Sequence, residues 1–404
     1  MIPFIFLLFV GLSLGQELLI LDHKKVYELA LRNNKDIQRL QEQIRALDID
    51  YQLAQRYYLP IVYVGASLLY DLDDKEAKTN VNLSVVSTLY EFQKARTRIE
   101  LSKIRKDITQ IMLGQLNRDI QLRIIKLFAD AHLYKKLTEV KREEMAIAYV
   151  RFDRARERKE LGLATDYEVL RLESIYREKR SELFYAQHMY NYTLLEVKQL
   201  AGIPYETLIE LEDLPFKESE KLLVDFSKLR EEALKNNASL RIKDMEIKSY
   251  EQELKAVRQT IEPKVNLRIS TDRSGLEFLT PIYDAGKPYK VEQLMSLRKS
   301  VQREKEALEQ GINLIFFSAP YEWEYLKAKW MEAFTKNRFA EENLTLRRSE
   351  YELELAFDLG YVMAEKSEVE RQLMEVRYKL ILFWAKLFNL AGRDPFMVLE
   401  YKYN

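Results

Sequence analysis

The sequence predicts a mainly α-helical protein with a small β part, in which one unit of helix, hairpin, long helix and helix occurs twice. Turn residues are scarce: 11 glycines and 9 prolines in 404 residues are less than half of the roughly 12% that is ordinary. Few turn residues imply long uninterrupted elements. Apolar residues also recur at the spacing of coiled-coil helices, and several short segments recur in the same order in both halves of the chain.

The internal repeat sets the expected domain boundaries. Five segments of the first half have counterparts about 190 to 203 residues later, which indicates a duplicated unit. The pairs are 26–34 with 229–237, Pro60 with Pro263, 89–94 with 282–287, 161–163 with 359–361, and 200–202 with 390–392. We therefore expect a first repeat over 16–202, a linker over 203–226, a second repeat over 227–392 and a C-terminal tail over 393–404.

Each repeat is expected to contain the same elements. The first helix, about 23–58 in the first repeat, should end before proline, because the residue before proline is disfavoured in the α conformation. The apolar period then changes from 3.6 to 2, which predicts a hairpin with one apolar and one polar face. The hairpins are expected at about 61–90 and 264–282, the long helices at about 93–160 and 287–358, and the closing helices at about 165–201 and 365–391.

The long helices are too long for an ordinary globular core. About 68 residues of helix span roughly 100 Å, so such a helix must lie beside others of similar length. The closing helix carries the matching apolar seam at steps of four and three, which predicts coiled-coil packing; its members are Val369, Leu373, Val376, Leu380, Phe383, Leu387 and Leu390. Pro320 is expected to kink the second long helix, because proline removes a backbone donor.

Composition excludes several classes of protein. Cysteine is absent, which excludes disulfide frameworks, thiolate metal sites and cysteine nucleophiles. The three histidines, His23, His132 and His188, do not lie at metal-ligand spacing, so we expect no metal and no cofactor. The 64 Lys and Arg residues balance the 64 Asp and Glu residues, so no nucleic-acid partner is expected. Without a phosphate-binding loop or a supported catalytic triad, we also expect no enzymatic activity.

The amino terminus has the character of a secretory signal. Residues 2–14 form an apolar run of about 13 residues, too short for a membrane-spanning helix of roughly 20 residues. Small residues follow at Ser13 and Gly15, so we interpret 1–15 as a signal peptide. No Lys or Arg precedes the run, and a buried first helix is the alternative. The mature protein is therefore expected to be exported.

Four amphipathic strands per chain cannot cross a membrane alone. The smallest membrane barrels use about eight strands, and unpaired strand edges cannot face lipid. Copies must therefore pool their strands, and three copies would supply twelve. Aromatic residues near the strand ends suit the interfacial girdles of such a barrel, although soluble sheets carry them too. An ordinary soluble hairpin packed on a helix is the alternative.

In the order and duplication of its motifs, the chain resembles the TolC-type outer-membrane efflux protein family. The residues that carry the resemblance are Leu29 to Asn34 with Ala233 to Asn237, Pro60 with Pro263, Ile282 to Lys287 with its degenerate copy Leu89 to Lys94, and Leu161 to Thr165. The resemblance implies a homotrimer, with a 12-stranded trimeric β-barrel in outer-membrane lipid and a periplasmic α-barrel of long coiled-coil helices. It also implies a periplasmic adaptor and an inner-membrane pump as partners.

The same resemblance implies two kinds of site. The turn at Leu161, Gly162 and Leu163, and a weaker second turn at Leu359, Gly360 and Tyr361, would be the tips that dock the adaptor. Glu365 and Glu368 would form an acidic ring that narrows the closed tunnel and favours cations. Two solvated carboxylates at a helix start are the alternative for that pair.

The resemblance implies a passive exit duct for efflux or type I secretion, opened by the adaptor and driven by the pump. Two other functions stay open. A soluble periplasmic coiled-coil adaptor or structural rod would share the export signal and the heptads, but it needs no hairpins. A cytosolic coiled-coil scaffold requires that the signal interpretation is wrong. The cargo, whether drug, metal ion or protein, does not follow from the sequence.

Overall fold

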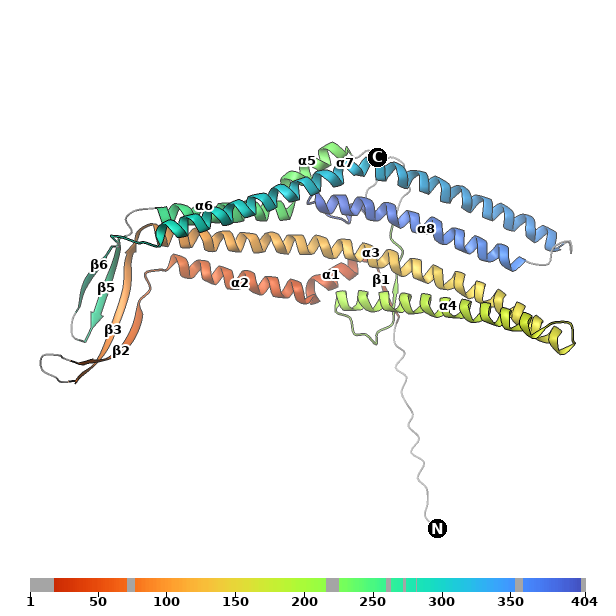
Figure 1. Ribbon diagram of the computed structural model, residues 1–404, viewed down its shortest axis with the longest axis horizontal. Helices are drawn as coiled ribbons and strands as arrows, with labels where there is room; N and C mark the ends of the chain where they lie inside the picture. The colour runs from red at the N-terminus through yellow and green to blue at the C-terminus, as the bar shows by residue number, and fades with distance from the viewer. Residues whose placement is uncertain are drawn as a thin grey trace, which may run out of the picture. The chain divides into compact units, whose positions relative to one another are not determined.

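The computed structural model describes residues 18–70, 77–215, 225–258, 263–271, 274–280, 282–352 and 359–400, so the predicted signal peptide lies outside the described residues. The chain divides into two units. The first, here the helical unit, comprises 1–35, 117–229 and 316–404; the second, here the strand unit, comprises 36–116 and 230–315. Two long helices, α3 (Phe92–Glu160) and α7 (Lys287–Glu352), contribute to both units (Figure 1).

The strand unit contains one four-stranded antiparallel sheet. Its strands are β2 (Ile61–Tyr70), β3 (Ala77–Glu91), β5 (Lys264–Ser270) and β6 (Ser274–Leu279), in the spatial order β2-β3-β5-β6. The two predicted hairpins are therefore joined into a single sheet through the pairing of β3 with β5. β3 pairs with β2 along its first part and with β5 along its last part, so the strands are staggered.

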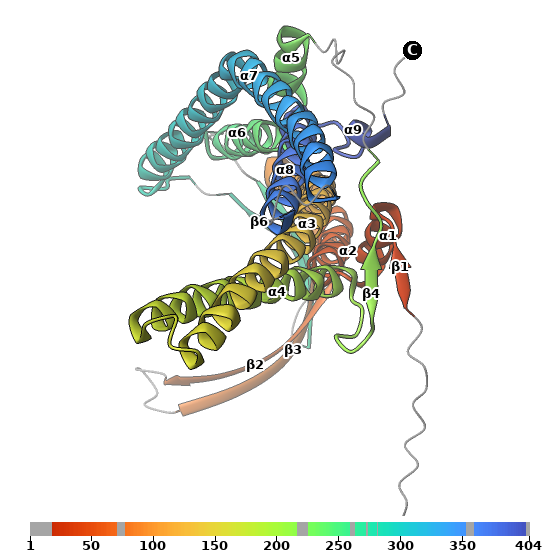
Figure 2. The ribbon, with the colours of Figure 1, turned by 90° about the vertical axis from the view of Figure 1, so that its right-hand side faces the viewer.

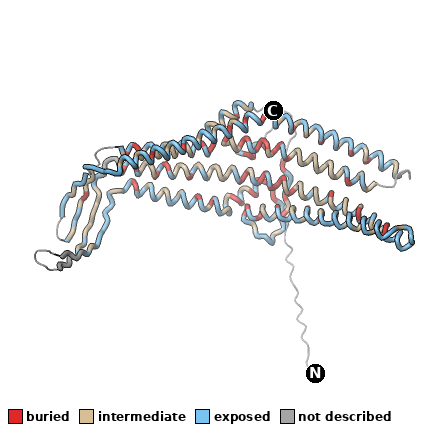
Figure 3. The backbone as a smooth tube through the Cα atoms, viewed as in Figure 1, coloured by how far each residue is buried: buried red, intermediate tan, exposed pale blue. Residues whose placement is uncertain are grey.

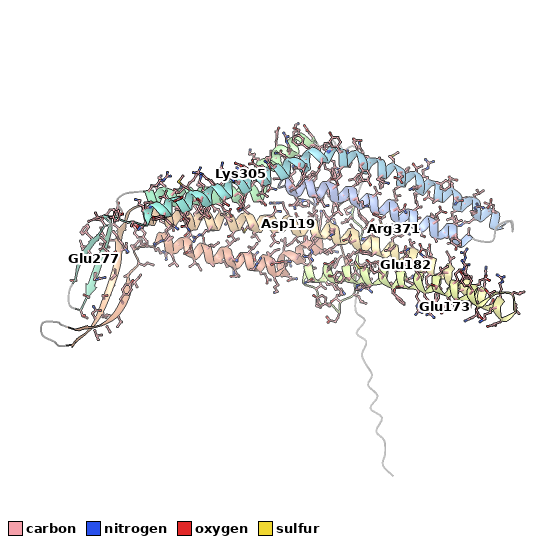
Figure 4. The ribbon with its side chains drawn as sticks, viewed as in Figure 1. Asp119, Glu173, Glu182, Glu277, Lys305 and Arg371 are labelled. Atoms are coloured by element: carbon pink, nitrogen blue, oxygen red, sulfur yellow. The ribbon has the colours of Figure 1, made fainter. Side chains whose placement is uncertain are left out.

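Two helix pairs accompany this sheet in the strand unit. α2 (Lys35–Gln55) is tied to α3 by an ion pair of 2.5 Å from Lys106 Nζ to Asp48 Oδ1. α6 (Ala238–Arg258) is tied to α7 by Lys243 and Glu304 at 2.8 Å, and by Lys305, labelled in Figure 4, and Asp244 at 2.7 Å. Exposed pairs of this kind contribute at most about 1 kcal/mol each. Burial of apolar residues therefore supplies most of the adhesion, and these residues include Leu40, Ile104, Leu240, Leu254 and Leu294.

The helical unit arranges its long helices in the order α4, α3, α8, α7. α4 (Asp166–Ala201) contacts α3 through Glu182 and Lys141, at 2.8 Å. α8 (Leu359–Leu390) contacts α3 through Glu370 and Lys136, at 2.9 Å. α7 contacts α8 through stacked rings, and Figure 2 shows α4 and α7 at opposite ends of this row.

The core of the helical unit lies around the second half of α8. Figure 3 shows buried residues concentrated there and along the adjoining part of α3. Five rings meet in one cluster: Phe226, Trp323, Phe383, Trp384 and Phe388. Burying each such side chain stabilises the fold by up to about 3 kcal/mol. The predicted seam is confirmed at Leu380, Phe383 and Leu387, which are all buried.

The predicted first helix, 23–58, is wrong in one respect, because it is two helices. α1 (His23–Asn33) ends at Asn34, whose backbone is extended, and α2 starts at the next residue. The second repeat breaks at the equivalent place, between α5 (Phe226–Asn236) and α6. There the Asn237 Oδ1 accepts hydrogen bonds from the backbone N–H groups of Ser239 and Leu240, at 3.0 and 3.3 Å. An asparagine that caps the next helix therefore explains the break.

A small parallel ribbon was not predicted. β1 (Leu19–Leu21) pairs with β4 (Ile209–Leu211), which lies within the segment expected to be a linker, and Figure 2 shows both strands beside α1. The predicted tail also contains a helix, α9 (Met397–Glu400). Phe396, just before it, packs edge-on against His23 and Tyr27 of α1, at ring distances of 5.0 and 5.5 Å. These contacts fasten the two ends of the described chain to the helical unit.

One further boundary differs from that predicted. α7 includes Pro320, where a kink is expected, as a helical residue, and is described as far as Glu352, so its predicted end at 358 lies outside the described residues. α8 begins at Leu359, six residues before the expected start, and residues 353–358 lie outside the described part of the chain. None of the described helices is both long and apolar enough to cross a membrane.

Candidate functional site

The first predicted tip is a tight turn between α3 and α4. Gly162 has a φ of 72°, in the left-handed region that favours glycine. Its N–H donates to the Lys159 carbonyl at 2.9 Å, and the Leu163 N–H donates to the Arg158 carbonyl at 2.8 Å. Thr165 then caps α4 by accepting a hydrogen bond from the Glu168 N–H at 3.2 Å. The positive φ of Gly162 and the cap at Thr165 thus explain why this sequence forms a tight turn here.

The surface of this turn is apolar. Leu161, Leu163 and Tyr167 are 73%, 65% and 76% exposed, and Leu170 on the next turn of α4 is 64% exposed. Charged side chains border them, and Lys159 and Asp166 form an ion pair across the turn. Neighbouring large apolar side chains with a charged border are typical of a surface that binds another protein.

The second predicted tip is not a turn. Leu359, Gly360 and Tyr361 lie in the first turn of α8, and among the described glycines Gly360 lacks the positive φ that Gly162 has. The short match between the two sequences therefore did not indicate the same conformation. Instead, the Tyr361 ring lies under the Arg151 guanidinium of α3, 4.2 Å from its centroid, in a cation–π contact that joins α8 to α3.

The two predicted gate residues, Glu365 and Glu368, have different surroundings on α8. Glu365 is exposed, whereas Glu368 is half-buried. Both oxygens of Glu368 accept hydrogen bonds from Arg371 at 2.8 Å, and Gln372 donates a third at 3.0 Å. Burial alone would raise the pKa of Glu368, but the hydrogen bonds from Arg371 and Gln372 outweigh it and hold that pKa below its usual value. Glu368 is therefore an ionised but neutralised carboxylate.

Arg371, labelled in Figure 4, is a neighbour of Glu368 that the sequence patterns did not identify. It also donates to Glu375 at 3.0 Å, and Glu375 in turn pairs with Lys379 at 2.6 Å. The sequence contained the information, because Arg371 lies three residues after Glu368 and four before Glu375. Oppositely charged residues at these spacings on a helix are neighbours. The result is a row of alternating charge along α8 rather than two free acids.

A groove of about 410 Å³ lies between α3, α4 and α8 of the helical unit. Its apolar lining includes Ile147, Leu172 and Ile175, and its charged lining includes Glu365 and Glu368. Beside it, four charges of α3 and α4 form a closed network with distances of 2.8 to 3.2 Å: Lys141, Glu144, Lys179 and Glu182. This network joins α3 to α4, and α8 is held against α3 by separate contacts.

No family model matches the sequence, and no curated protein matches it either. Solved structures do match. The CmeC outer membrane channel of Campylobacter jejuni has a TM-score of 0.67 at 13% identity, over 92% of this chain and 85% of that one. A membrane protein from Pseudomonas aeruginosa gives 0.64 at 15%, over 92% and 90%. The outer membrane protein VceC of Vibrio cholerae gives 0.63 at 15%, over 95% and 97%.

This chain has the fold of these outer-membrane proteins. The match extends over more than nine tenths of the sequence, so it includes the sheet and the long helices together. The resemblance to the TolC-type family that the repeated motifs indicated is thereby confirmed for the fold.

Proposed function

We propose that this protein is the outer-membrane exit duct of a tripartite efflux or type I secretion system. The observation that carries the proposal is the match to an outer-membrane channel over almost the whole length of the chain. The duct is passive: the chain supplies a conduit, and an inner-membrane pump supplies the energy. The protein then resides in the outer membrane and extends into the periplasm.

The exposed faces of α4 and α7, the two outer helices of the row in the helical unit, support assembly with further copies. α7 buries one seam within the helical unit, which includes Phe316, Leu326, Ala333 and Ala340. A second seam of the same helix is exposed, and it consists of Phe317, Tyr321, Tyr325, Met331, Phe339 and Leu346. α4 exposes Leu170, Phe184, Tyr192 and Leu195. A helix with two apolar seams needs two helical neighbours, so the α7 of one copy would pack on the α4 of the next.

The sheet supports the same assembly. β2 and β6 are the outer strands of the four-stranded sheet, and their open edges could not face lipid. A closed ring of copies joined edge to edge removes both open edges. Three copies give a 12-stranded barrel, which lies within the range that membrane barrels use. The helices of the same three copies would form the periplasmic α-barrel.

The tips support a docking and opening step. In this proposal the adaptor binds the apolar turn at Leu161, Gly162 and Leu163, and also the start of α8 at Leu359, Gly360 and Tyr361. Opening moves α8 away from the joined helices α3 and α4, so it must break the contacts of Lys136 with Glu370 and of Arg151 with Tyr361. The adaptor can drive this change only if it binds the open arrangement more tightly. Glu365 and Glu368 remain the proposed acidic residues of the gate, with Arg371 beside them.

Fractionation and reconstitution test this function against the alternative of a soluble periplasmic adaptor or rod. We expect the protein in the outer-membrane fraction, soluble only with detergent, as a trimer by light scattering, and conducting in planar bilayers. A monomer that stays folded in aqueous buffer and forms no channel would exclude the duct.

A further inference from the structure

Side-chain burial divides α8 into two parts within one copy of the chain. Nine residues of this fully described helix are buried, and eight of them lie at or beyond Tyr378. The ninth is Ala364, so the first part, 359–377, contains a single buried side chain. Figure 3 shows the concentration of buried residues in the second part, 378–390. Because apolar burial supplies most of the adhesion between helices, the second part is held more firmly than the first.

The contacts that hold the first part of α8 to α3 include two with partly exposed side chains. Tyr361 is 43% exposed and lies under the guanidinium of Arg151, at 4.2 Å from the ring centroid. Glu370, at 33% exposure, pairs with Lys136 at 2.9 Å. Contacts of both kinds are weak where water reaches them. The first part of α8 can therefore leave α3 at a small cost in free energy.

A connector, residues 209–214, contacts α8 at the boundary between its two parts. The Arg377 Nη1 donates to the Asp213 Oδ2 at 2.9 Å, and its Nη2 donates to the Leu214 carbonyl at 3.0 Å. The Tyr378 hydroxyl donates to the Asp213 Oδ1 at 2.6 Å. Tyr378 and Leu214 are each only 1% exposed. Two successive residues of α8 thus engage both oxygens of Asp213.

The connector is itself fastened to other elements of the helical unit. Its strand β4 pairs with β1, and the Glu212 N–H donates to the Leu21 carbonyl at 2.9 Å. Glu210 forms an ion pair of 3.1 Å with Lys135 of α3. The connector therefore joins α8 to both α3 and β1, and it reaches α8 about two turns beyond Glu370.

We infer that Asp213 is a positioning residue of the duct: it fixes the point on α8, at Arg377 and Tyr378, at which the movement of the first part ends. The inference rests on the proposed function, since it concerns the opening step. A contact that persists in the closed and the open state favours neither of them. Asp213 therefore determines how far along α8 the movement extends, not how often the duct opens. Without Asp213, the movement would continue as far as Phe383 and Trp384, which the aromatic cluster holds.

Hydrogen exchange of backbone amides, followed by mass spectrometry on the purified trimer in detergent, locates this point. In the wild type we expect fast exchange in peptides from 359–377 and slow exchange from residue 378 onward, because local opening controls exchange. Asp213→Ala removes the acceptor of two charge-assisted hydrogen bonds. Exchange should then rise at least about tenfold in 378–383, while 384–390 stays slow.

Two further variants sharpen this measurement. Tyr378→Phe keeps the buried ring but deletes the hydroxyl, so it should raise exchange in the same peptides by a smaller factor. Asp119→Ala is the matched control. Asp119, labelled in Figure 4, accepts a hydrogen bond from Asn389 of α8 at 2.9 Å, far from the connector. We expect this control to leave the exchange boundary in place.

Single-channel recordings in planar bilayers supply a readout that a merely structural role would not change. Asp213→Ala should raise the conductance of the open level, because a longer moving segment opens the duct further. Its open probability should stay within about twofold of the wild type, because the contact persists in both states.

The outcomes separate this inference from the proposed function. A wild-type trimer that conducts, together with an exchange boundary that Asp213→Ala leaves at 377, would overturn the inference alone. A changed open probability with an unchanged open conductance would also overturn it, because Asp213 would then lock the closed state. If Asp213→Ala fails to assemble, the boundary in Tyr378→Phe decides in its place. A wild-type protein that forms no channel would overturn the proposed function and this inference together.

Discussion

Lys136 of α3 and Glu370 of α8 form an ion pair of 2.9 Å in the helical unit, with side chains only 20% and 33% exposed. Burial alone would lower the pKa of Lys136, but pairing with Glu370 raises it above its usual value. The pKa of Glu370 is held below its usual value by Lys136 and Lys366, against the opposing effect of burial. Both groups therefore stay charged near neutral pH, and the pair joins the two helices that must separate when the proposed duct opens.

Removing this pair should favour the open duct. Lys136→Met keeps the length of the side chain but deletes the charge, and a pair of this exposure contributes up to about 1 kcal/mol, which is about fivefold in an equilibrium. We expect a severalfold higher open probability in planar bilayers. Lys379→Met is the matched control, because Lys379 pairs with Glu375 within α8 itself. An equal effect of both variants would show that general loss of charge, rather than this contact, matters.

The two proposed gate carboxylates, Glu365 and Glu368, should change the ion selectivity in the same direction but to different extents. Glu365 is exposed, and among the described residues no ion-pair partner faces it, so Glu365→Gln removes one net negative charge. Glu368→Gln instead leaves the guanidinium of Arg371 with one carboxylate partner, Glu375. We expect Glu365→Gln to lower the permeability of potassium over chloride in every state of the gate. We expect Glu368→Gln to lower it further and to lose this additional effect when Arg371→Gln is added.

Measurement of reversal potentials for the two single variants and the double variant decides between these roles. If Arg371→Gln does not modify the effect of Glu368→Gln, the bidentate contact has no part in the selectivity. If neither carboxylate variant changes the reversal potential, the pair lies outside the narrow part of the duct.

The conformational difference between the two tip glycines leads to a stability prediction. A side chain at Gly162, with φ of 72°, costs about 1 kcal/mol even though there is space for a methyl group. Gly360 lies within a helix, where alanine is favoured over glycine by about 1 kcal/mol. Gly162→Ala should therefore lower the midpoint of thermal unfolding and Gly360→Ala should raise it. Changes of the same sign would contradict the assigned conformations.

Docking at the first tip makes a separate prediction. Leu161→Asp places a charge on the apolar surface of the turn without changing its backbone, since Leu161 is 73% exposed. We expect loss of efflux and of cross-linking to the adaptor, with an intact trimer in detergent. Leu208→Asp is the matched control, because Leu208 is also exposed, at 52%, and lies outside the turn. Normal efflux with Leu161→Asp would exclude this turn as the docking point.

The sequence predicted those features that depend on local periodicity. Leu380, Phe383 and Leu387 are buried as their heptad spacing requires, and the alternation of the hairpins is realised as two faces of one sheet. Two features depended instead on local backbone conformation and on hydrogen bonds between side chains and the backbone. The spacing of apolar residues does not indicate the helix break at Asn34 or the helix cap at Asn237. The pairing of β1 with β4 joins residues 190 positions apart, and nothing in their sequences specifies the partner.

The site was predicted less completely for a related reason. Glu365 and Glu368 were identified by their spacing, but the charge state of Glu368 depends on Arg371, whose bidentate geometry follows only from the helix and its burial. Likewise, Leu359 to Tyr361 match the first tip in sequence, whereas the conformation of Gly360 follows from the helix that contains it.

The contact between His23 and Phe396 should make the attachment of the C-terminal segment sensitive to pH. His23 is buried, its ring lies 5.0 Å from that of Phe396, and its Nε2 has no hydrogen-bond partner among the described residues. Burial lowers the pKa of His23 below its usual 6.5, and this effect outweighs the nearby acids Asp22, Glu212 and Glu400. The folded protein thus favours the neutral ring. The stabilisation is complete above the unfolded pKa and is lost as pH falls through the folded value.

We therefore expect the midpoint temperature of thermal unfolding to decrease when the pH is lowered from 7.5 to 5.5. These two values lie about one unit on either side of the unfolded pKa. His23→Phe keeps an aromatic ring against Phe396 but cannot be protonated, so its midpoint should change less over the same interval. Limited proteolysis provides the local measurement, because a released C-terminal segment is cleaved before the rest of the chain. Identical pH profiles for the wild type and His23→Phe would show that other groups, not this ring, titrate with the loss of structure.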